Sequence, residues 1–115
     1  MGFCYVTTVG RVTGRRHPIE IWFGISDEGV AYLLSGGGRR SDWVRNLEAD
    51  PAVTIAFGRP NDRVIPGRAR VVTDPDEDGL ARRLLASKYQ GWTESREMST
   101  WARTALPVAI ERADE

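Results

Sequence analysis

The sequence predicts a mainly β domain of the α+β class, in which six antiparallel strands form a small, partly open barrel with two to three helices between them. Apolar and polar residues alternate in several short runs, which is typical of half-buried strands. Short turns join the first three runs, and this indicates an antiparallel meander rather than the parallel βαβ units of a Rossmann fold. Helix-start signals at Ser41 and Asp74 indicate that helices lie between some of the strands. With no internal repeat or linker, residues 1–115 are expected to form a single domain.

The strands are expected where alternating runs are bounded by turn residues. In chain order they are Phe3–Val9, Pro18–Ile25, Val30–Leu34, Ala52–Phe57, Arg63–Thr73 and Ala105–Glu111. Pro66 and Gly67 fall within the fifth run and predict a bulge or a bend there. Pro107 falls within the last run, and because proline cannot donate to a ladder, we expect that strand at a sheet edge.

The first helix is expected from Ser41 to Ala49. Trp43, Val44 and Leu47 form its apolar stripe, and a proline two residues after Ala49 prevents its continuation. The helix follows the glycines directly, so its start is expected to lie at the groove that binds a ligand.

The second helix begins with a strong signature. Asp74 is the expected N-cap, Pro75 the first helical residue, and Glu77 the acid that completes a capping box. We therefore interpret the acidic run after Asp74 as structural rather than catalytic. The expected buried face carries Leu80, Leu84 and Leu85. A short third helix is expected in the segment from Trp92 to Arg103.

The charge balance limits the classes of partner. Sixteen basic and sixteen acidic residues give no net charge, which argues against non-specific nucleic-acid binding. The single cysteine, Cys4, excludes an internal disulfide and provides no metal cluster, so no metal is expected. No apolar run approaches the roughly 20 residues of a membrane-spanning helix, and no signal peptide is recognised. A cytoplasmic protein is the expectation.

The stretch from Ser35 to Leu47, SGGGRRSDWVRNL, is the strongest candidate for a binding site. Its three glycines allow a ligand to approach the backbone closely, and the helix start behind them presents unpaired N–H groups. Arg39 and Arg40 add positive charge, so the stretch suits a phosphate or a carboxylate. The alternative is a flexible glycine turn with two solvated arginines.

Four motifs give the chain a resemblance to the deazaflavin-dependent nitroreductases. Residues 7–14 (TTVGRVTG) resemble their TTxGRxTG opening, and residues 35–38 (SGGG) are similar to their SKGG. Residues 43–51 (WVRNLEADP) resemble WYLNLxANP, and residues 101–108 (WARTALPV) resemble WTxRTIPIV. The resemblance implies a split β-barrel of the flavin/deazaflavin oxidoreductase superfamily. It also implies binding of coenzyme F420 and hydride delivery to a quinone, a nitroaromatic or another conjugated acceptor.

The resemblance further implies the residues of a cofactor site and an acceptor pocket. The cofactor residues would be Arg11, Arg15, Arg16, His17, Ser35, Gly36, Gly37, Gly38, Arg39, Arg40, Ser41, Trp43 and Asn46. The acceptor residues would be Trp92, Ser95 and Met98, which stand where the nitroreductases have three tyrosines. Basic residues of the family are replaced here by Val12, Gly36 and His17. Nearby arginines could supply that charge instead, namely Arg15, Arg16, Arg39 and Arg40. The sequence shows no counterpart of the nitroreductases' usual N-terminal segment.

No catalytic side chain is expected, because in a hydride transfer the cofactor carries the reactive atom and the protein positions it. We interpret His17 as an anion contact or a turn residue, since no carboxylate partner is evident, and Cys4 as a small core residue. Trp22 either shields one face of a cofactor or lies on the outer face of its strand. Trp92 and Trp101 are candidates for ligand stacking, although core packing is the preferred interpretation for Trp101.

Two alternatives to an F420-dependent oxidoreductase stay open. The first is a non-catalytic protein that holds F420, a flavin or an apolar ligand in the same groove. The second is a reductase that uses FMN, because related split barrels bind it. The expected partners are a small-molecule electron acceptor and, because a Trp-rich chain leaves apolar surface over, a second copy in a homodimer.

Overall fold

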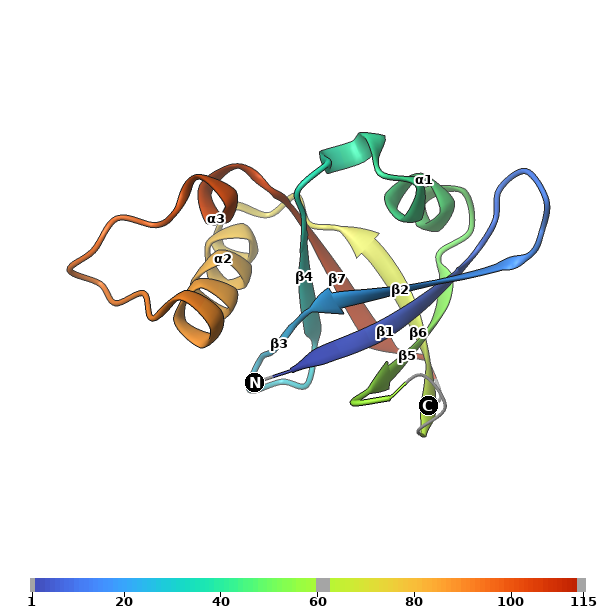
Figure 1. The fold of residues 1–115 in the computed structure, drawn as a ribbon, viewed down its shortest axis with the longest axis horizontal. Helices are drawn as coiled ribbons and strands as arrows, with labels where there is room; N and C mark the ends of the chain where they lie inside the picture. The colour runs from blue at the N-terminus through green and yellow to red at the C-terminus, as the bar shows by residue number, and fades with distance from the viewer. Residues whose placement is uncertain (1, 60–62, 114–115) are drawn as a thin grey trace.

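One antiparallel sheet curls into a half-open barrel in the computed structural model, which describes residues 2–59 and 63–113 (Figure 1). Within these residues seven strands follow the order β2-β1-β5-β6-β7-β4-β3. In chain order they are β1 Phe3–Val9, β2 Arg16–Trp22, β3 Gly24–Ile25, β4 Ala31–Ser35, β5 Ala52–Phe57, β6 Val64–Val71 and β7 Leu106–Arg112. All neighbouring strands pair antiparallel. The predicted partly open barrel with helices is confirmed.

The helices lie at one end and on one side of this barrel (Figure 1). They are the 3-10 helix η1 (Gly38–Arg40), α1 (Asp42–Ala49), α2 (Pro75–Gln90) and α3 (Thr100–Thr104). Helix α1 contacts β1 and β6, whereas α2 contacts β3, β4 and β7. The first helix begins where predicted, with Ser41 as its N-cap residue. No helix in the described part of the chain combines the length and the apolar character needed to cross a membrane.

Two hydrophobic cores result, one on each face of the sheet. The barrel core consists of inward-facing strand residues, and Val44 and Leu47 of α1 close it at one end. The second core lies against the outer face of β4 and β7, where Leu34 and Ala109 meet Leu85 of α2. Burying one leucine fully contributes roughly 1.5–3 kcal/mol. Apolar packing therefore holds α2 on the side of the sheet that faces away from the barrel interior.

The predicted strand from Pro18 to Ile25 is divided in two at Phe23. β2 pairs with β1 at one edge of the sheet, whereas β3 pairs with β4 at the other edge. Between them the Phe23 N–H donates to the hydroxyl of Tyr89 (3.1 Å), and Lys88 Nζ donates to the Phe23 carbonyl (2.9 Å). Side chains from α2 thus satisfy the backbone groups that leave the ladder. This is why the sheet has one strand more than predicted.

Strand β6 is continuous through Pro66 and Gly67, so the bulge that was one of the two predicted alternatives is wrong. These two residues pair with Thr54 and Val53 of β5 in an unbroken register. The Pro66 carbonyl accepts a hydrogen bond from the Ala113 N–H (3.1 Å), so the donor that proline lacks would face Ala113, one residue past the end of β7, and only that reciprocal bond is lost. A β-carbon at Gly67 would lie 2.6 Å from Cγ2 of Ile110, so glycine is needed for close packing rather than for a bend.

Strand β7 lies in the interior of the sheet, so the prediction that Pro107 marks an edge is wrong. β7 pairs with β4 on one side and with β6 on the other. The Pro107 carbonyl accepts from the Val72 N–H (3.0 Å), just beyond the last β6–β7 pair, Val71 with Val108. The missing N–H of Pro107 faces the same side, past the end of the ladder, and a buried central strand therefore tolerates the proline.

Helix α2 begins as predicted, and its packed face contains the three predicted leucines together with two alanines. The carboxylate of Asp74 accepts a hydrogen bond from the Glu77 N–H (2.9 Å), and Pro75 is the first helical residue. The fully buried residues are Ala81, Leu85 and Ala86, whereas Leu80 and Leu84 are only half-buried. Leu80 and Leu84 still pack against the second core, so the predicted leucine face is confirmed, and two alanines extend it.

Candidate functional site

The glycine turn connects β4 to α1 through η1 and is fixed by hydrogen bonds among its own residues. Buried Ser35 donates from its hydroxyl to the Gly38 carbonyl (3.1 Å), and its oxygen lies 2.9 Å from Oγ of Ser41. A β-carbon at Gly37 would collide with Ser41 Oγ, and Gly38 has a φ of +63°, which favours glycine. At Gly36, by contrast, a β-carbon would make no close contact and φ is not positive. The predicted glycine stretch is thus an ordered turn.

The start of α1 offers backbone donors to a ligand. Ser41 has N-cap geometry, but its side chain makes no capping hydrogen bond to the helix because it contacts Ser35 instead. Since the first amides of a helix need partners from outside the helix, a bound anion can provide them.

The two arginines of the turn differ in their contacts. The Arg39 guanidinium forms an ion pair with Glu48 on α1. Arg40 is exposed, and its side chain has no hydrogen-bond or ion-pair partner within residues 2–59 and 63–113. Arg40 is therefore the better placed of the two for an anionic ligand, because Glu48 partly neutralises the charge of Arg39.

A second basic region lies on the hairpin between β1 and β2. Arg15, Arg16 and His17 are all exposed there. Figure 1 shows this hairpin on the opposite side of α1 from η1, so the predicted cofactor residues form two separate groups around that helix. His17 belongs to β2, where it pairs with Thr8. A β-carbon at Gly10 would lie 2.6 Å from His17 Nε2, so the imidazole packs closely on the backbone of the turn.

Arg11 and Asn46 join the hairpin to α1. The side-chain oxygen of buried Asn46 accepts from the Arg11 N–H (3.2 Å) and from Arg11 Nη1 (2.7 Å), and its amide nitrogen donates to Thr8 (3.1 Å). Arg11 also forms an ion pair with Asp42 (3.2 Å). These contacts use most of the donors and acceptors of both side chains. Half-buried Trp43 likewise packs against the barrel core. Arg11 and Asn46 nevertheless line, together with His17, a small pocket of about 190 Å³ between the hairpin and α1, whereas Trp43 supports the site from the barrel core.

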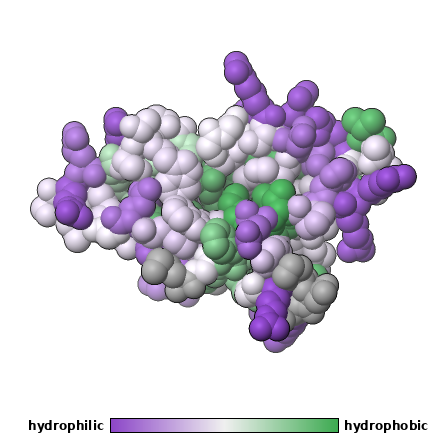
Figure 2. Space-filling model, in the orientation of Figure 1, coloured by the Kyte–Doolittle hydropathy of each residue, from purple (hydrophilic) through white to green (hydrophobic). Residues whose placement is uncertain are grey.

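An aromatic cavity of about 360 Å³ lies between β2 and helices α2 and α3. Trp22 and Trp101 line it, with ring centroids 5.5 Å apart and nearly perpendicular planes. Figure 2 shows that this face of the molecule carries a patch of apolar side chains over β2. A β-carbon at Gly36 would lie 3.7 Å from Cδ1 of Trp101, so the cavity and the glycine turn share one indole. Trp22 faces away from the barrel interior, packs against the second core and lines the cavity, so both interpretations of this residue stay open.

The loop between α2 and α3 contains the predicted acceptor residues. Trp92 and Met98 line one hollow of about 480 Å³, and Gln90 lines both this hollow and the aromatic cavity. The Trp92 indole N–H donates to the Arg96 carbonyl (2.8 Å), which fixes its orientation. Ser95 does not line the hollow, and its hydroxyl lies 3.2 Å from that of Thr93. The structure therefore brings two of the three residues together.

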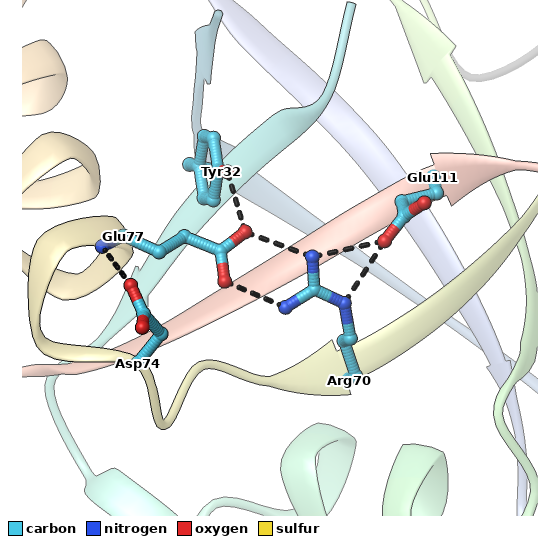
Figure 3. Close-up of polar contacts among 5 residues, drawn as sticks. All are labelled: Tyr32, Arg70, Asp74, Glu77 and Glu111. Atoms are coloured by element: carbon cyan, nitrogen blue, oxygen red, sulfur yellow. Dashed lines mark hydrogen bonds and ion pairs between the residues drawn. The ribbon is translucent and has the colours of Figure 1, made fainter.

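A partly exposed polar cluster, in which Tyr32 is buried and the Arg70 side chain is 44% exposed, was not predicted from the sequence (Figure 3). The hydroxyl of Tyr32 donates to Glu77 (2.6 Å), and Arg70 donates two hydrogen bonds of 2.8 Å to the same carboxylate. Arg70 also contacts Glu111 (2.9 Å). Burial, with the contact to Glu77, raises the pKa of Tyr32 to about 12, and the Arg70 hydrogen bonds lower the pKa of Glu77. The predicted capping box is therefore incomplete, because the Glu77 carboxylate joins α2 to β4 and β6 instead.

Cys4 has no role in this site. It is fully buried on β1 in the barrel core, and burial raises the pKa of its thiol to about 12. A thiol of this kind stays protonated at neutral pH and is a poor nucleophile. The interpretation of Cys4 as a core residue is confirmed.

Comparison with known proteins agrees with the fold. No curated protein matches the sequence. A conserved hypothetical protein from Mycobacterium tuberculosis has a TM-score of 0.79 at 20% identity, over 98% of this chain and 74% of that one. A structure described as an F420 reductase has a TM-score of 0.63 at 22% identity, over 96% and 85%. An F420-H2 dependent reductase has a TM-score of 0.66 at 20% identity, over 94% and 91%. At these identities the likeness concerns the fold.

The family model described as pyridoxamine 5'-phosphate oxidase matches residues 2–115. The match spans both the glycine turn and the aromatic cavity, and the half-open barrel is the architecture that the resemblance implied. This chain therefore belongs to the pyridoxamine 5'-phosphate oxidase family.

Proposed function

We propose that this chain is an oxidoreductase that uses coenzyme F420 and passes a hydride from the reduced deazaflavin to a quinone, a nitroaromatic or another conjugated acceptor. The observation that carries the proposal is the position of Trp101, which lies against Gly36 of the glycine turn and also lines the aromatic cavity. An anion-binding turn joined to an aromatic cavity suits a cofactor with a flat ring and an anionic tail. Family membership and the fold of the two F420 reductases support this proposal.

The residues present fit such a cofactor. The uncapped start of α1 and the Arg40 guanidinium would bind the anionic tail, and Trp22 and Trp101 would contact the ring. F420 supplies the hydride when it is bound, so no side chain has to act as a nucleophile. The role of the protein would be to orient the ring and to exclude water from it, and an apolar, aromatic wall is suited to both.

The choice of F420 over FMN rests on charge. The tail of F420 carries more negative charge than the single phosphate of FMN, and exposed arginines lie on both sides of α1. We expect titration with F420 to quench the fluorescence of the coenzyme saturably, with a lower Kd than that of FMN. FMN that binds equally well or better would reverse this assignment and favour an FMN-dependent reductase, the alternative that the family description supports.

A turnover assay distinguishes an F420-dependent enzyme from a protein that only binds the cofactor. Reduced F420 mixed with the protein and either menadione or a nitroaromatic compound should be oxidised faster than without the protein, as followed by the absorbance of oxidised F420. Tight binding without faster oxidation would leave the chain as a non-catalytic holder of the cofactor.

The acceptor is proposed to approach from the loop between α2 and α3. Trp92 and Met98 line a hollow there, and Gln90 connects this hollow to the aromatic cavity. Met98→Ala should raise the KM for menadione while the Kd for F420 stays unchanged. An unchanged KM would indicate that the acceptor binds elsewhere.

Association into a homodimer is a separate proposal. The outer edge of β2 has no strand partner in the described chain, and Phe3 on the adjacent β1 is 44% exposed. A second copy could cover both features. Light scattering at high micromolar concentration should report twice the monomer mass, and a monomer mass would end this idea.

A further inference from the structure

The end of the barrel opposite α1 contains a second, larger opening into the apolar interior. Its volume is about 450 Å³, which is within the range of small-molecule sites. Its apolar walls are formed mainly by Phe23, Ile25, Ile55, Phe57, Ile65 and Ile110. Ile25 at the rim is 43% exposed, so the apolar lining reaches the surface.

The shape of the lining favours a flat ring. Phe23 and Phe57 lie with their ring centroids 4.8 Å apart at an angle of 59°. An aromatic ligand placed beside such a tilted pair can make edge and face contacts with both rings, which adds to the energy of apolar burial. Apart from Arg112 the rest of the lining is apolar, so an apolar body is required.

The charge at the rim favours an anionic group. Among the described residues that line the opening, Arg112 is the only one with a charged side chain. A guanidinium has five N–H donors, so Arg112 can bind a carboxylate even while it keeps another contact. No described lining residue carries a carboxylate, which would repel such a ligand.

This opening is separate from the proposed cofactor site. Phe23 belongs to the barrel core, whereas its neighbour Trp22 belongs to the second core on the other face of the sheet. A ligand in the barrel end would therefore be separated by the sheet from a ring bound beside Trp22.

We propose that this barrel end is a second binding site, which takes a planar aromatic monocarboxylate with its ring beside Phe23 and Phe57 and its carboxylate at Arg112. The site is independent of the oxidoreductase function, because none of its lining residues belongs to the glycine turn or to the aromatic cavity.

The six isoleucines of the chain make the test specific. Four of them line the barrel end, Ile25, Ile55, Ile65 and Ile110, whereas Ile21 lines the aromatic cavity and Ile19 lines neither. The protein with labelled isoleucine methyl groups would be titrated with 2-naphthoate and followed by NMR. We expect saturable shifts of the four lining methyl groups and little change at Ile19 and Ile21. Shifts centred on Ile21, or no saturable shifts, would overturn the proposal.

Charge variants test the role of Arg112. Arg112→Gln should weaken 2-naphthoate binding by about ten- to a hundred-fold, which is the range for loss of a charge-assisted hydrogen bond. Arg68→Gln is the matched control, because Arg68 is exposed on β6 and does not line the opening. Naphthalene-2-carboxamide should bind more weakly than 2-naphthoate, and 2-naphthylmethylamine more weakly still. Equal affinities for the three would contradict the proposed carboxylate contact.

Variants at the rim test where the ligand binds. The dependence on protein concentration tests whether a second copy of the chain occupies the barrel end instead. Ile25→Asp should abolish detectable binding by repulsion, whereas Val64→Asp, an equally exposed change outside the lining, should not. Methyl shifts that appear on concentrating the protein without ligand, together with a doubled mass, would show that a second copy covers the barrel end and would overturn the proposal.

Discussion

The indole ring of Trp22 lies flat against the phenol ring of Tyr89, with 4.3 Å between the centroids and 6° between the planes. The stack joins the last residue of β2 to α2. The same Tyr89 hydroxyl donates to the Gly2 carbonyl (2.7 Å) and accepts from the Phe23 N–H. One side chain therefore fixes both the wall of the aromatic cavity and the point where the strand is interrupted.

Replacing Tyr89 by phenylalanine should separate these two roles. Tyr89→Phe keeps the stack but leaves the Phe23 N–H without its acceptor, so we expect a loss of about 1–3 kcal/mol in the free energy of unfolding, measured with urea. Tyr5→Phe is the control, because the exposed Tyr5 hydroxyl contacts only Glu20 (2.7 Å), and no measurable change is expected. Equal stability of the two variants would mean that the strand break does not depend on Tyr89.

Removing Arg39 and Arg40 should weaken coenzyme binding without unfolding the protein. The double alanine variant should bind F420 roughly ten- to a hundred-fold more weakly per lost contact. Most of the loss should come from Arg40, because Arg39 is paired with Glu48. The wild-type affinity should also fall with added salt, since the attracting charges are exposed. Thermal stability should barely change.

Arg68→Ala, on an exposed position of β6, is the matched control for that experiment. If the double variant binds F420 normally, the glycine turn is only a turn. The anion site must then be sought at Arg15, Arg16 and His17 on the hairpin.

A lysine at Gly36 should be tolerated and should strengthen binding. A β-carbon there makes an ordinary contact of 3.7 Å with Trp101, and Gly36 does not have a positive φ. Gly36→Lys restores the charge of the related SKGG motif, so we expect F420 to bind up to about tenfold more tightly. Ala49→Lys, an exposed change at the other end of α1, should not tighten the binding of F420. Weaker binding by Gly36→Lys would place the tail elsewhere.

The Glu77 cluster should make stability depend on acid pH. Hydrogen bonds from Arg70 lower the pKa of Glu77 in the folded state. The stabilisation is therefore present above the unfolded pKa of about 4.5 and is lost as the pH falls through the lower folded value. Glu77→Gln should be less stable than wild type at pH 7 by about 1–2 kcal/mol and should lose less on acidification. Asp27→Asn, in an exposed turn, should behave like wild type in urea unfolding at pH 7 and pH 3.

The Cys4 thiol should be protected in the folded protein. Its side chain is fully buried and its pKa is raised to about 12, so reaction with a disulfide reagent at pH 8 requires local opening of β1. The native protein should react at least about a hundred-fold more slowly than the urea-unfolded protein. Rapid native reaction, followed by absorbance, would show that β1 opens readily.

The parts of the fold that depend on local sequence were predictable. Alternating residues identified the strands, and Asp74 with Pro75 identified the start of α2, because those signals lie within a few residues of the structures that they specify. The division at Phe23 depends on Tyr89, 66 residues away, and no local pattern reports it. The interior place of β7 depends on pairing between strands distant in sequence, which the edge preference of Pro107 could not outweigh.

In the candidate site, too, the features that depend on local sequence were predictable and those that depend on tertiary contacts were not. The glycine turn and the helix start at Ser41 lie where the sequence indicated them. The contact between Gly36 and Trp101 was not predictable, because it depends on how α3 packs beside the end of β4. The buried contacts of Asn46 with Thr8 and Arg11 also follow from tertiary structure, since a motif match says which residue is present but not which way it points.

The interior position of β7 has a consequence for how the protein is made. β7 is the last of the seven described strands to leave the ribosome, yet β4 and β6 both require it as a neighbour. At roughly 5–20 residues per second, the growing chain passes through an interval in which both strands have open edges. The sheet can therefore close only after residues 106–112 have emerged. A product terminated before Leu106 keeps those edges open, which makes it recognisable to proteases and chaperones as unfinished.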